Sequence, residues 1–170
     1  MKIMNKDYLY SPWRLDYIMS EKPGDCVLCR VQRHDNDVDN LILHRGPHCY
    51  IMLNRYPYNN GHLMVVPYLH AGSINELPEA AWNEASNLLR TCEMALQKVY
   101  KCDGINIGIN LGAAAGAGIA EHLHIHVVPR WAGDSNFMSV VSGQRVIPEA
   151  FETAFDKLSR EFAKLLSPKG

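Results

Sequence analysis

Long apolar runs are missing from this chain of 170 residues. A helix that crosses a bilayer needs about 20 consecutive apolar residues, and no stretch approaches that length. The first residues, 1–7, also lack the apolar core of a secretory signal peptide. From these absences we expect a protein of the cytoplasm that has no membrane partner.

An excess of charge of one sign is missing too, because 17 Lys and Arg face 18 Asp and Glu, a formal net charge of −1. Such a balance gives no general electrostatic attraction to nucleic acid, so we expect no nucleic-acid partner. It leaves room for a local pocket that binds a small anion. The five cysteines are an odd number, which argues against a disulfide framework and indicates a reducing compartment.

The composition is that of an ordinary globular protein, with 47% hydrophobic and 21% charged residues. No internal repeat, low-complexity tract or convincing linker divides the chain. We therefore expect one α+β domain over residues 1–170. Its core should cover about residues 26–140, between an N-terminal arm (1–25) and a C-terminal helix (148–166).

Short apolar runs bounded by turn residues predict β-strands. They lie at residues 41–44, 49–53, 62–67 and 104–110. Turn-linked strands of this kind favour an antiparallel sheet. Apolar steps of three and four residues over 81–99 predict a long helix that packs on the sheet. Ser11-Pro12 predicts a short helix in the N-terminal arm, and residues 132–144 should cover the site as a mobile segment.

Three histidines, His122, His124 and His126, alternate with aliphatic residues, and this alternation predicts a strand. Successive side chains of a strand point to opposite faces, so the three imidazoles should share one face at spacings of about 7 Å. In a helix they would fan apart and could not act together. The aliphatic residues expected on the other face are Leu123, Ile125 and Val127.

One histidine on a strand is usually an ordinary surface or core residue, but three at strict alternation indicate chemistry. They could bind a catalytic zinc with an open position for water. Alternatively, one imidazole is a nucleophile, and its neighbours supply protons and positive charge to an anionic group. The small-residue loop over 110–118 favours the nucleophile, because such a loop lets a phosphate approach main-chain N–H groups closely.

Cys26 and Cys29 form a Cys-x-x-Cys pair with three interpretations: zinc ligands, a redox pair, or two buried thiols. The redox interpretation is weak, because a thioredoxin-like site requires a βαβ unit and these strands look antiparallel. Zinc requires two further ligands, and spacing alone does not choose among the histidines that follow. These are His44, His48, His62 and His70.

The stretch from His122 to Val128 resembles the His-φ-His-φ-His-φ-φ signature of the histidine triad (HIT) superfamily. The likeness extends through residues 53–55, residues 61–67 and the loop from Asn110, and it covers roughly residues 26–140. Within the superfamily, the sequence looks most like the bacterial diadenosine tetraphosphate (Ap4A) phosphorylase branch, both at Ser11-Pro12-Trp13-Arg14 and over residues 110–131. Fhit-type dinucleoside polyphosphate hydrolases resemble the chain next best.

The resemblance implies a fold and a set of roles. The HIT-like fold is an antiparallel sheet of about five strands with a long helix and a C-terminal helix, dimerised into a continuous sheet. His124 would be the nucleophile that forms a nucleotidyl-imidazole intermediate, and His126 would contact the phosphate and help the leaving group depart. Asn54 falls where relatives bind the ribose, and His62 and Leu63 where they line the nucleotide pocket.

The resemblance also implies phosphate-binding and metal-binding positions. Phosphate groups would be held by Asn110 and by the loop residues Gly116, Ala117 and Gly118. A structural zinc, with no organic cofactor, would be held by four ligands. These ligands are Cys26, Cys29, His70 and His122.

The implied reaction is phosphorolysis of Ap4A to ADP and ATP, with adenine nucleotides and inorganic phosphate as small-molecule partners. The chain departs from the family pattern at Gly118, where many relatives carry a Gln or Ser side chain. This departure keeps a second activity open, hydrolysis of dinucleoside polyphosphates or adenosine phosphoramidates with release of AMP. From another class, a nucleotide-binding module without turnover also stays open.

Overall fold

The computed structural model describes residues 25–134 and 149–167. The expected helix near Ser11 lies outside the described residues, as does most of the segment expected to cover the site (132–144). None of the helices in the described part of the chain is both long and apolar enough to pass through a membrane.

Five antiparallel strands form one sheet, with the order β1-β2-β3-β5-β4. Their bounds are β1 (Ile42–Arg45), β2 (Cys49–Leu53), β3 (Leu63–Pro67), β4 (Gly104–Ile109) and β5 (Ile125–Arg130). The helices of the described residues are α2 (Val27–Arg33), α3 (Glu79–Tyr100) and α5 (Phe151–Leu166), with short 3-10 turns η1 (Ile74–Glu76) and η2 (Ala113–Ala115). The predicted α+β fold with an antiparallel sheet, a long helix and a C-terminal helix is confirmed.

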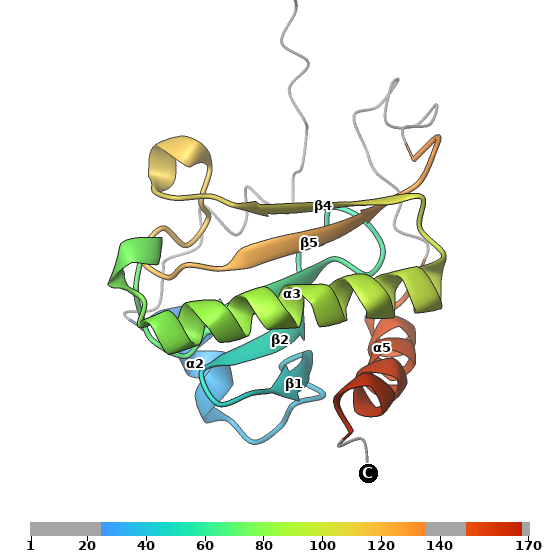
Figure 1. Ribbon diagram of the computed structural model, residues 1–170, viewed down its shortest axis with the longest axis horizontal. Helices are drawn as coiled ribbons and strands as arrows, with labels where there is room; N and C mark the ends of the chain where they lie inside the picture. Colours follow the sequence, from blue (N-terminus) through green and yellow to red (C-terminus); the bar gives the residue numbers. More distant parts are fainter. Residues whose placement is uncertain (1–24, 135–148, 168–170) are drawn as a thin grey trace, which may run out of the picture.

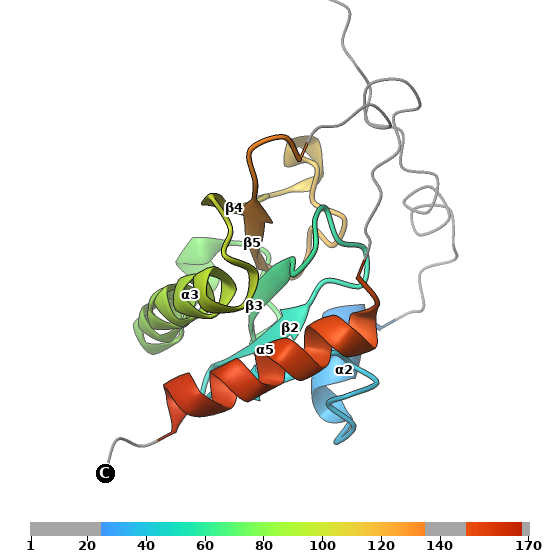
Figure 2. The same cartoon turned by 90° about the vertical axis from the view of Figure 1, so that its right-hand side faces the viewer.

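The helices α3 and α5 cover one face of the sheet (Figures 1 and 2). Alternate residues of the strands point to this face, among them Ile51, Val65 and Val127, which are fully buried. They pack against an apolar stripe on α3 and against Leu158 and Phe162 of α5. Burial of each such side chain contributes about 1.5–3 kcal/mol, so this layer holds the sheet in place.

The opposite face of the sheet carries a smaller apolar cluster beneath α2. Leu28 of α2 packs there against Tyr50, whose hydroxyl donates a hydrogen bond to the Leu28 carbonyl at 3.0 Å. Met64 and Val66 of β3 belong to the same cluster. The same face continues across β3 onto β5 and β4, where it is not covered by α3 or α5 (Figure 2). The histidine site lies on this second face.

Candidate active site and metal centre

The triad straddles the start of β5, because the strand begins at Ile125 and only His126 lies within it. Leu123, Ile125 and Val127 are buried in the core, as the alternation predicts. The expected strand over all three histidines is wrong at His122, which lies in a bend, and at His124, which precedes the strand. Hydrogen bonds to other segments replace the strand ladder there: the Leu123 N–H donates to the Ala71 carbonyl at 2.7 Å.

Four side chains meet where α2 approaches the ends of β3 and the triad segment. Their ligand atoms, one per residue, all lie within 4.8 Å of one another. His122 Nδ1 is 3.4 Å from both the Cys26 and Cys29 sulfurs, and His70 Nδ1 is 3.3 Å from Cys29 Sγ. The residues are Cys26, Cys29, His70 and His122. The sequence left four histidines as candidate ligands to join Cys26 and Cys29, and the fold brings His70 of these four to the pair.

The chemistry of these donors fits a tetrahedral metal ion. The His122 Nε2 lies 2.9 Å from the Pro67 carbonyl, which only accepts, so Nε2 carries the proton and Nδ1 offers its lone pair toward the thiols. Two ligands of a tetrahedral zinc with ordinary bond lengths are about 3.6 Å apart, close to the observed S···N distances. Burial and the neighbouring Cys26 raise the pKa of Cys29 to about 11. The cluster is therefore a candidate metal-binding site with four protein ligands.

His124 presents one ring nitrogen to the site. Its Nδ1 lies 2.9 Å from the His122 carbonyl, which fixes the proton on Nδ1 and leaves the lone pair on Nε2. Only 7% of the residue is exposed, and burial lowers its pKa below 6.5. A neutral imidazole with a directed lone pair is a nucleophile at neutral pH.

His126 takes its orientation from His62. The Tyr58 main-chain N–H donates to His62 Nδ1 at 3.0 Å, so the His62 proton lies on Nε2, which donates to His126 Nδ1 at 3.0 Å. Burial, with His126 and His124 close by, lowers the pKa of His62 well below 6.5 and keeps it neutral. In neutral His126 the proton is consequently on Nε2, where it can be donated to a ligand.

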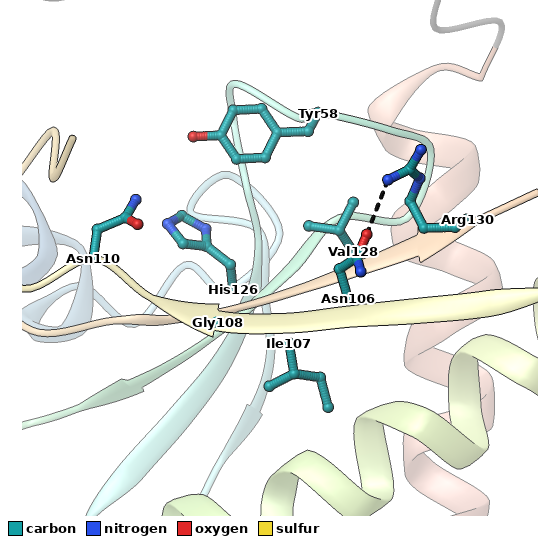
Figure 3. A pocket seen from close by; sticks show the side chains of 8 residues that line it. All are labelled: Tyr58, Asn106, Ile107, Gly108, Asn110, His126, Val128 and Arg130. Atoms are coloured by element: carbon teal, nitrogen blue, oxygen red, sulfur yellow. Dashed lines mark hydrogen bonds between the residues drawn. The ribbon is translucent and has the colours of Figure 1, made fainter. Parts of the chain in front are cut away.

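A pocket of about 280 Å³ opens beside His126 on the face away from α3. Figure 3 shows His126 and Asn110 at one end, Asn106 and Arg130 at the other, and Tyr58 above them. The rings of His124 and His126 meet edge to face at 4.8 Å. The pocket therefore leads directly to the triad.

The predicted nucleotide-binding residues after β2 fall on both faces of the sheet. Asn54 lies beside His62, with its Nδ2 3.4 Å from His62 Nδ1, and its Oδ1 accepts from the Tyr56 N–H at 2.9 Å. Leu63 is fully buried in the core, on the face opposite His126. We therefore assign the Leu63 side chain to the core.

The small-residue loop turns back on itself after β4. The Gly116 N–H donates to the Ala113 carbonyl at 3.0 Å, and the Ala117 N–H donates to the Gly112 carbonyl at 3.4 Å. Gly112 and Gly116 have φ angles of 79° and 86°, a region that favours glycine. Asn110 lines the pocket. These contacts do not place Gly116, Ala117 or Gly118 against a triad ring, so their phosphate role stays a prediction.

A family model described as HIT domain matches residues 36–133. This chain belongs to the HIT family. An AP-4-A phosphorylase from Mycobacterium tuberculosis is 36% identical over 172 residues, which cover 92% of this chain and 84% of that protein. An adenylylsulfatase from Arabidopsis thaliana is 32% identical over 118 residues, covering 66% of this chain and 58% of that protein.

A solved HIT structure supports the same assignment. The Zn-bound histidine triad family protein from Mycobacterium smegmatis matches with a TM-score of 0.67 and 26% identity, covering 83% of this chain and 95% of that one. The five-stranded sheet and its helices are thus the HIT fold.

Three side chains of this HIT site were missed by the reasoning from sequence: Tyr58, Asn106 and Arg130. The alternation that predicts the triad strand continues from His126 through Val128 to Arg130, and the run over 104–110 alternates Asn106 with Ile107. These patterns could have placed Arg130 and Asn106 on the site face. Nothing in the loop that contains Tyr58 signals its position.

Proposed function

We propose that this HIT protein transfers a nucleotidyl group from dinucleoside polyphosphates through His124, most directly in the phosphorolysis of Ap4A to ADP and ATP. The observation that carries the proposal is the His124 ring, whose Nδ1 proton is held by the His122 carbonyl and whose Nε2 is left as the nucleophile. The similarity to the mycobacterial AP-4-A phosphorylase supports the choice of substrate.

In the first step His124 Nε2 attacks the α-phosphorus of Ap4A. A P–N bond forms as the P–O bond to the leaving group breaks, and ATP departs with the bonding electron pair. His126 donates a hydrogen bond from its Nε2–H to the bridging oxygen, and this contact stabilises the negative charge that develops on the departing ATP. Covalent capture splits the displacement into two easier steps.

In the second step a phosphate oxygen attacks the phosphorus of the nucleotidyl-histidine. The P–N bond breaks, ADP is released, and His124 returns to its neutral form. Asn110 and the main-chain N–H groups of Gly116, Ala117 and Gly118 would offset the negative charge on the reacting phosphoryl group. Asn54 and His62 would hold the nucleoside end.

The four-ligand cluster would hold a structural zinc, with all positions filled by Cys26, Cys29, His70 and His122. A zinc there supplies a cross-link rather than a reaction step. Because His122 Nδ1 faces the metal site, the ion would anchor the segment that presents His124. The zinc-bound mycobacterial neighbour supports this choice of metal.

Hydrolysis is the second candidate function. Gly118 offers no side-chain hydroxyl or amide to hold a phosphate acceptor at the position where many relatives carry Ser or Gln. In that case water would attack the nucleotidyl-histidine and AMP would be the product.

A product assay with Ap4A, in the presence and absence of inorganic phosphate, tests the proposal. Phosphorolysis predicts ADP and ATP in equal amounts, formed only with phosphate. Formation of AMP at a rate unaffected by phosphate would replace phosphorolysis with hydrolysis. Nucleotide binding without any turnover would indicate a binding module instead. His124→Ala should abolish turnover, whereas His48→Ala, a change at an exposed histidine beside β2, should leave it unaltered.

A further inference from the structure

The pocket extends well beyond the triad along β5 and β4. His126, Val128 and Arg130 point to the same face of β5, and Asn106 and Gly108 pair with Val128 and His126 from β4. At about 3.4 Å per residue, Arg130 lies about 14 Å from His126 along the strand. Figure 3 shows the two ends of this strip, with Tyr58 overhanging it.

The far end of the strip presents hydrogen-bond donors. Arg130 uses Nε and Nη2 for the two oxygens of Asp134, at 2.6 and 2.9 Å, and Nη1 for Asn106 Oδ1 at 2.9 Å. A guanidinium has five N–H groups, so two stay available. Because Asn106 Oδ1 accepts from Arg130, the NH₂ group of Asn106 also remains as a donor. Within residues 25–134 and 149–167, the hydrogen bonds of Arg130 and Asn106 leave these four N–H groups without an acceptor.

The positive member of the Arg130–Asp134 ion pair is the one exposed to solvent at this end of the strip. The Asp134 side chain is only 9% exposed and also accepts from Asn59 Nδ2 at 3.0 Å, whereas the Arg130 side chain is 42% exposed. The hydrogen bond with Asp134 raises the pKa of Arg130 and keeps it charged. A ligand that enters the pocket therefore meets the cationic, donating side of the pair.

The floor between the two ends is clear. Gly108 is the β4 residue opposite His126, and a Cβ built there would meet no atom within 4 Å. Val128 is only 8% exposed and forms a low floor. An extended ligand can therefore lie along the strip from His126 to Arg130.

We propose that Arg130 and Asn106 form a phosphate-binding subsite for the part of the substrate that leaves, the phosphates beyond the one attacked by His124. The unused N–H groups of Arg130 and Asn106 can donate hydrogen bonds only to a ligand that has acceptor atoms. The oxygens of a phosphate group are such acceptors, and their negative charge strengthens the hydrogen bonds. The subsite is too far from His126 to hold an inorganic phosphate that attacks the phosphorus on His124. This inference rests on the proposed function. It makes the phosphates beyond the attacked one the part of the substrate that determines substrate specificity.

The variant Asn106→Asp tests the subsite. The new carboxylate still accepts from Arg130, but it replaces the NH₂ donors by a negative charge at an exposed strand position, so the fold should be retained. We expect kcat/KM for Ap4A to fall about ten- to a hundredfold, the usual effect of one charged hydrogen bond. For an adenosine phosphoramidate, which has no distal phosphates, kcat/KM should change less than about twofold. Asn83→Asp, which adds the same charge to an exposed position of α3, is the matched control.

Equal losses on both substrates, or no loss on Ap4A, would overturn the subsite. If the wild-type protein turns over neither substrate, the proposed function fails, and calorimetry then tests the subsite separately. ATP and AMP share the nucleotidyl end, but only ATP has distal phosphates. Asn106→Asp should weaken binding of ATP and leave binding of AMP unchanged; an unchanged affinity ratio would overturn the inference. Should phosphate itself occupy the subsite, the variant would raise the KM for phosphate instead, which would also overturn it.

Discussion

The three histidines of the triad differ in the hydrogen-bond partner that fixes the proton on each ring. Carbonyl oxygens accept from His122 Nε2 and His124 Nδ1, so the lone pair of His122 is on Nδ1, at the metal site, and that of His124 is on Nε2. His126 Nδ1 accepts a hydrogen bond from His62 Nε2, so the single proton of His126 stays on Nε2 for the ligand. Equal spacing in the sequence therefore corresponds to three different roles.

The pH profile of kcat/KM should reflect the lowered pKa of His124. The nucleophile must be neutral, and burial shifts its pKa downward, so activity is retained through pH 6.5 and lost only as the pH falls through the lowered value. We expect the acid limb to have its midpoint below pH 6.5. A midpoint at or above 6.5 that titrates with His124 would contradict the assignment.

The orientation of His126 by His62 can be tested with two substitutions. His62→Phe removes the donor, so kcat should fall about ten- to a hundredfold, within the contribution of a positioned proton donor, while KM changes little. His62→Gln places an N–H near the original Nε2 and should restore much of the activity. Equal kinetics in the two variants would show that His62 only fills space.

At the scale of single residues, much of the candidate site could be predicted from the sequence. The alternation places the histidines opposite Leu123, Ile125 and Val127, and the structure confirms that division. The pattern could not show that Leu63 faces the core while His62 faces the site, because a resemblance transfers positions and not side-chain directions. Nor could it show that His62 sets the proton of His126, since that hydrogen bond joins residues 64 positions apart.

The element most dependent on tertiary contacts is the short helix α2. It has seven residues, no side-chain hydrogen bond at its N-cap, and only two buried residues, Leu28 and Cys29. Helices this short are not stable by themselves. A metal held by Cys29 together with His70 and His122 would fasten α2 to the sheet.

Loss of a metal ligand should therefore reduce stability more than loss of an ordinary thiol. We expect Cys29→Ser to lower the thermal midpoint by more than about 5 °C, since 1 kcal/mol corresponds to about 2–4 °C in a chain of this size. Elemental analysis should find one zinc per chain in the wild type and much less in the variant. Cys102→Ser, outside the cluster, is the control. The metal assignment fails if the purified protein contains no metal and the two variants melt together.

Element boundaries followed the sequence where local pattern dominates. The long helix expected at 81–99 runs from Glu79 to Tyr100, and the strand expected at 49–53 is β2. The C-terminal helix begins at Phe151 rather than at residue 148. β5 starts later than expected because His122 is held by Pro67 and the cysteines, contacts that no local pattern contains.

At the scale of the whole molecule, the order of the strands in the sheet could not be predicted from their spacing in the sequence. β5 lies between β3 and β4, although α3, β4 and the small-residue loop separate it from β3 in the chain. That insertion brings His62 beside His126 and creates the site. The order also leaves β4 as an edge strand, with Ile107 on its surface 49% exposed.

The exposed edge of β4 is where the expected homodimer would form, by extension of the sheet into a second copy. Light scattering should then give twice the mass of one chain. Ile107→Lys should shift the protein toward monomer, whereas Val38→Lys, at a residue 61% exposed and away from β4, should not. A monomeric wild type at micromolar concentration would rule out the dimer.

The nucleotidyl-histidine is the most direct test of the account as a whole. Wild-type protein mixed with Ap4A in the absence of phosphate, quenched in base and digested, should carry one nucleotidyl group on the peptide that contains His124. Addition of phosphate before the quench should convert that group into ADP. An adduct on another residue, or full turnover by His124→Ala, would contradict the central claim.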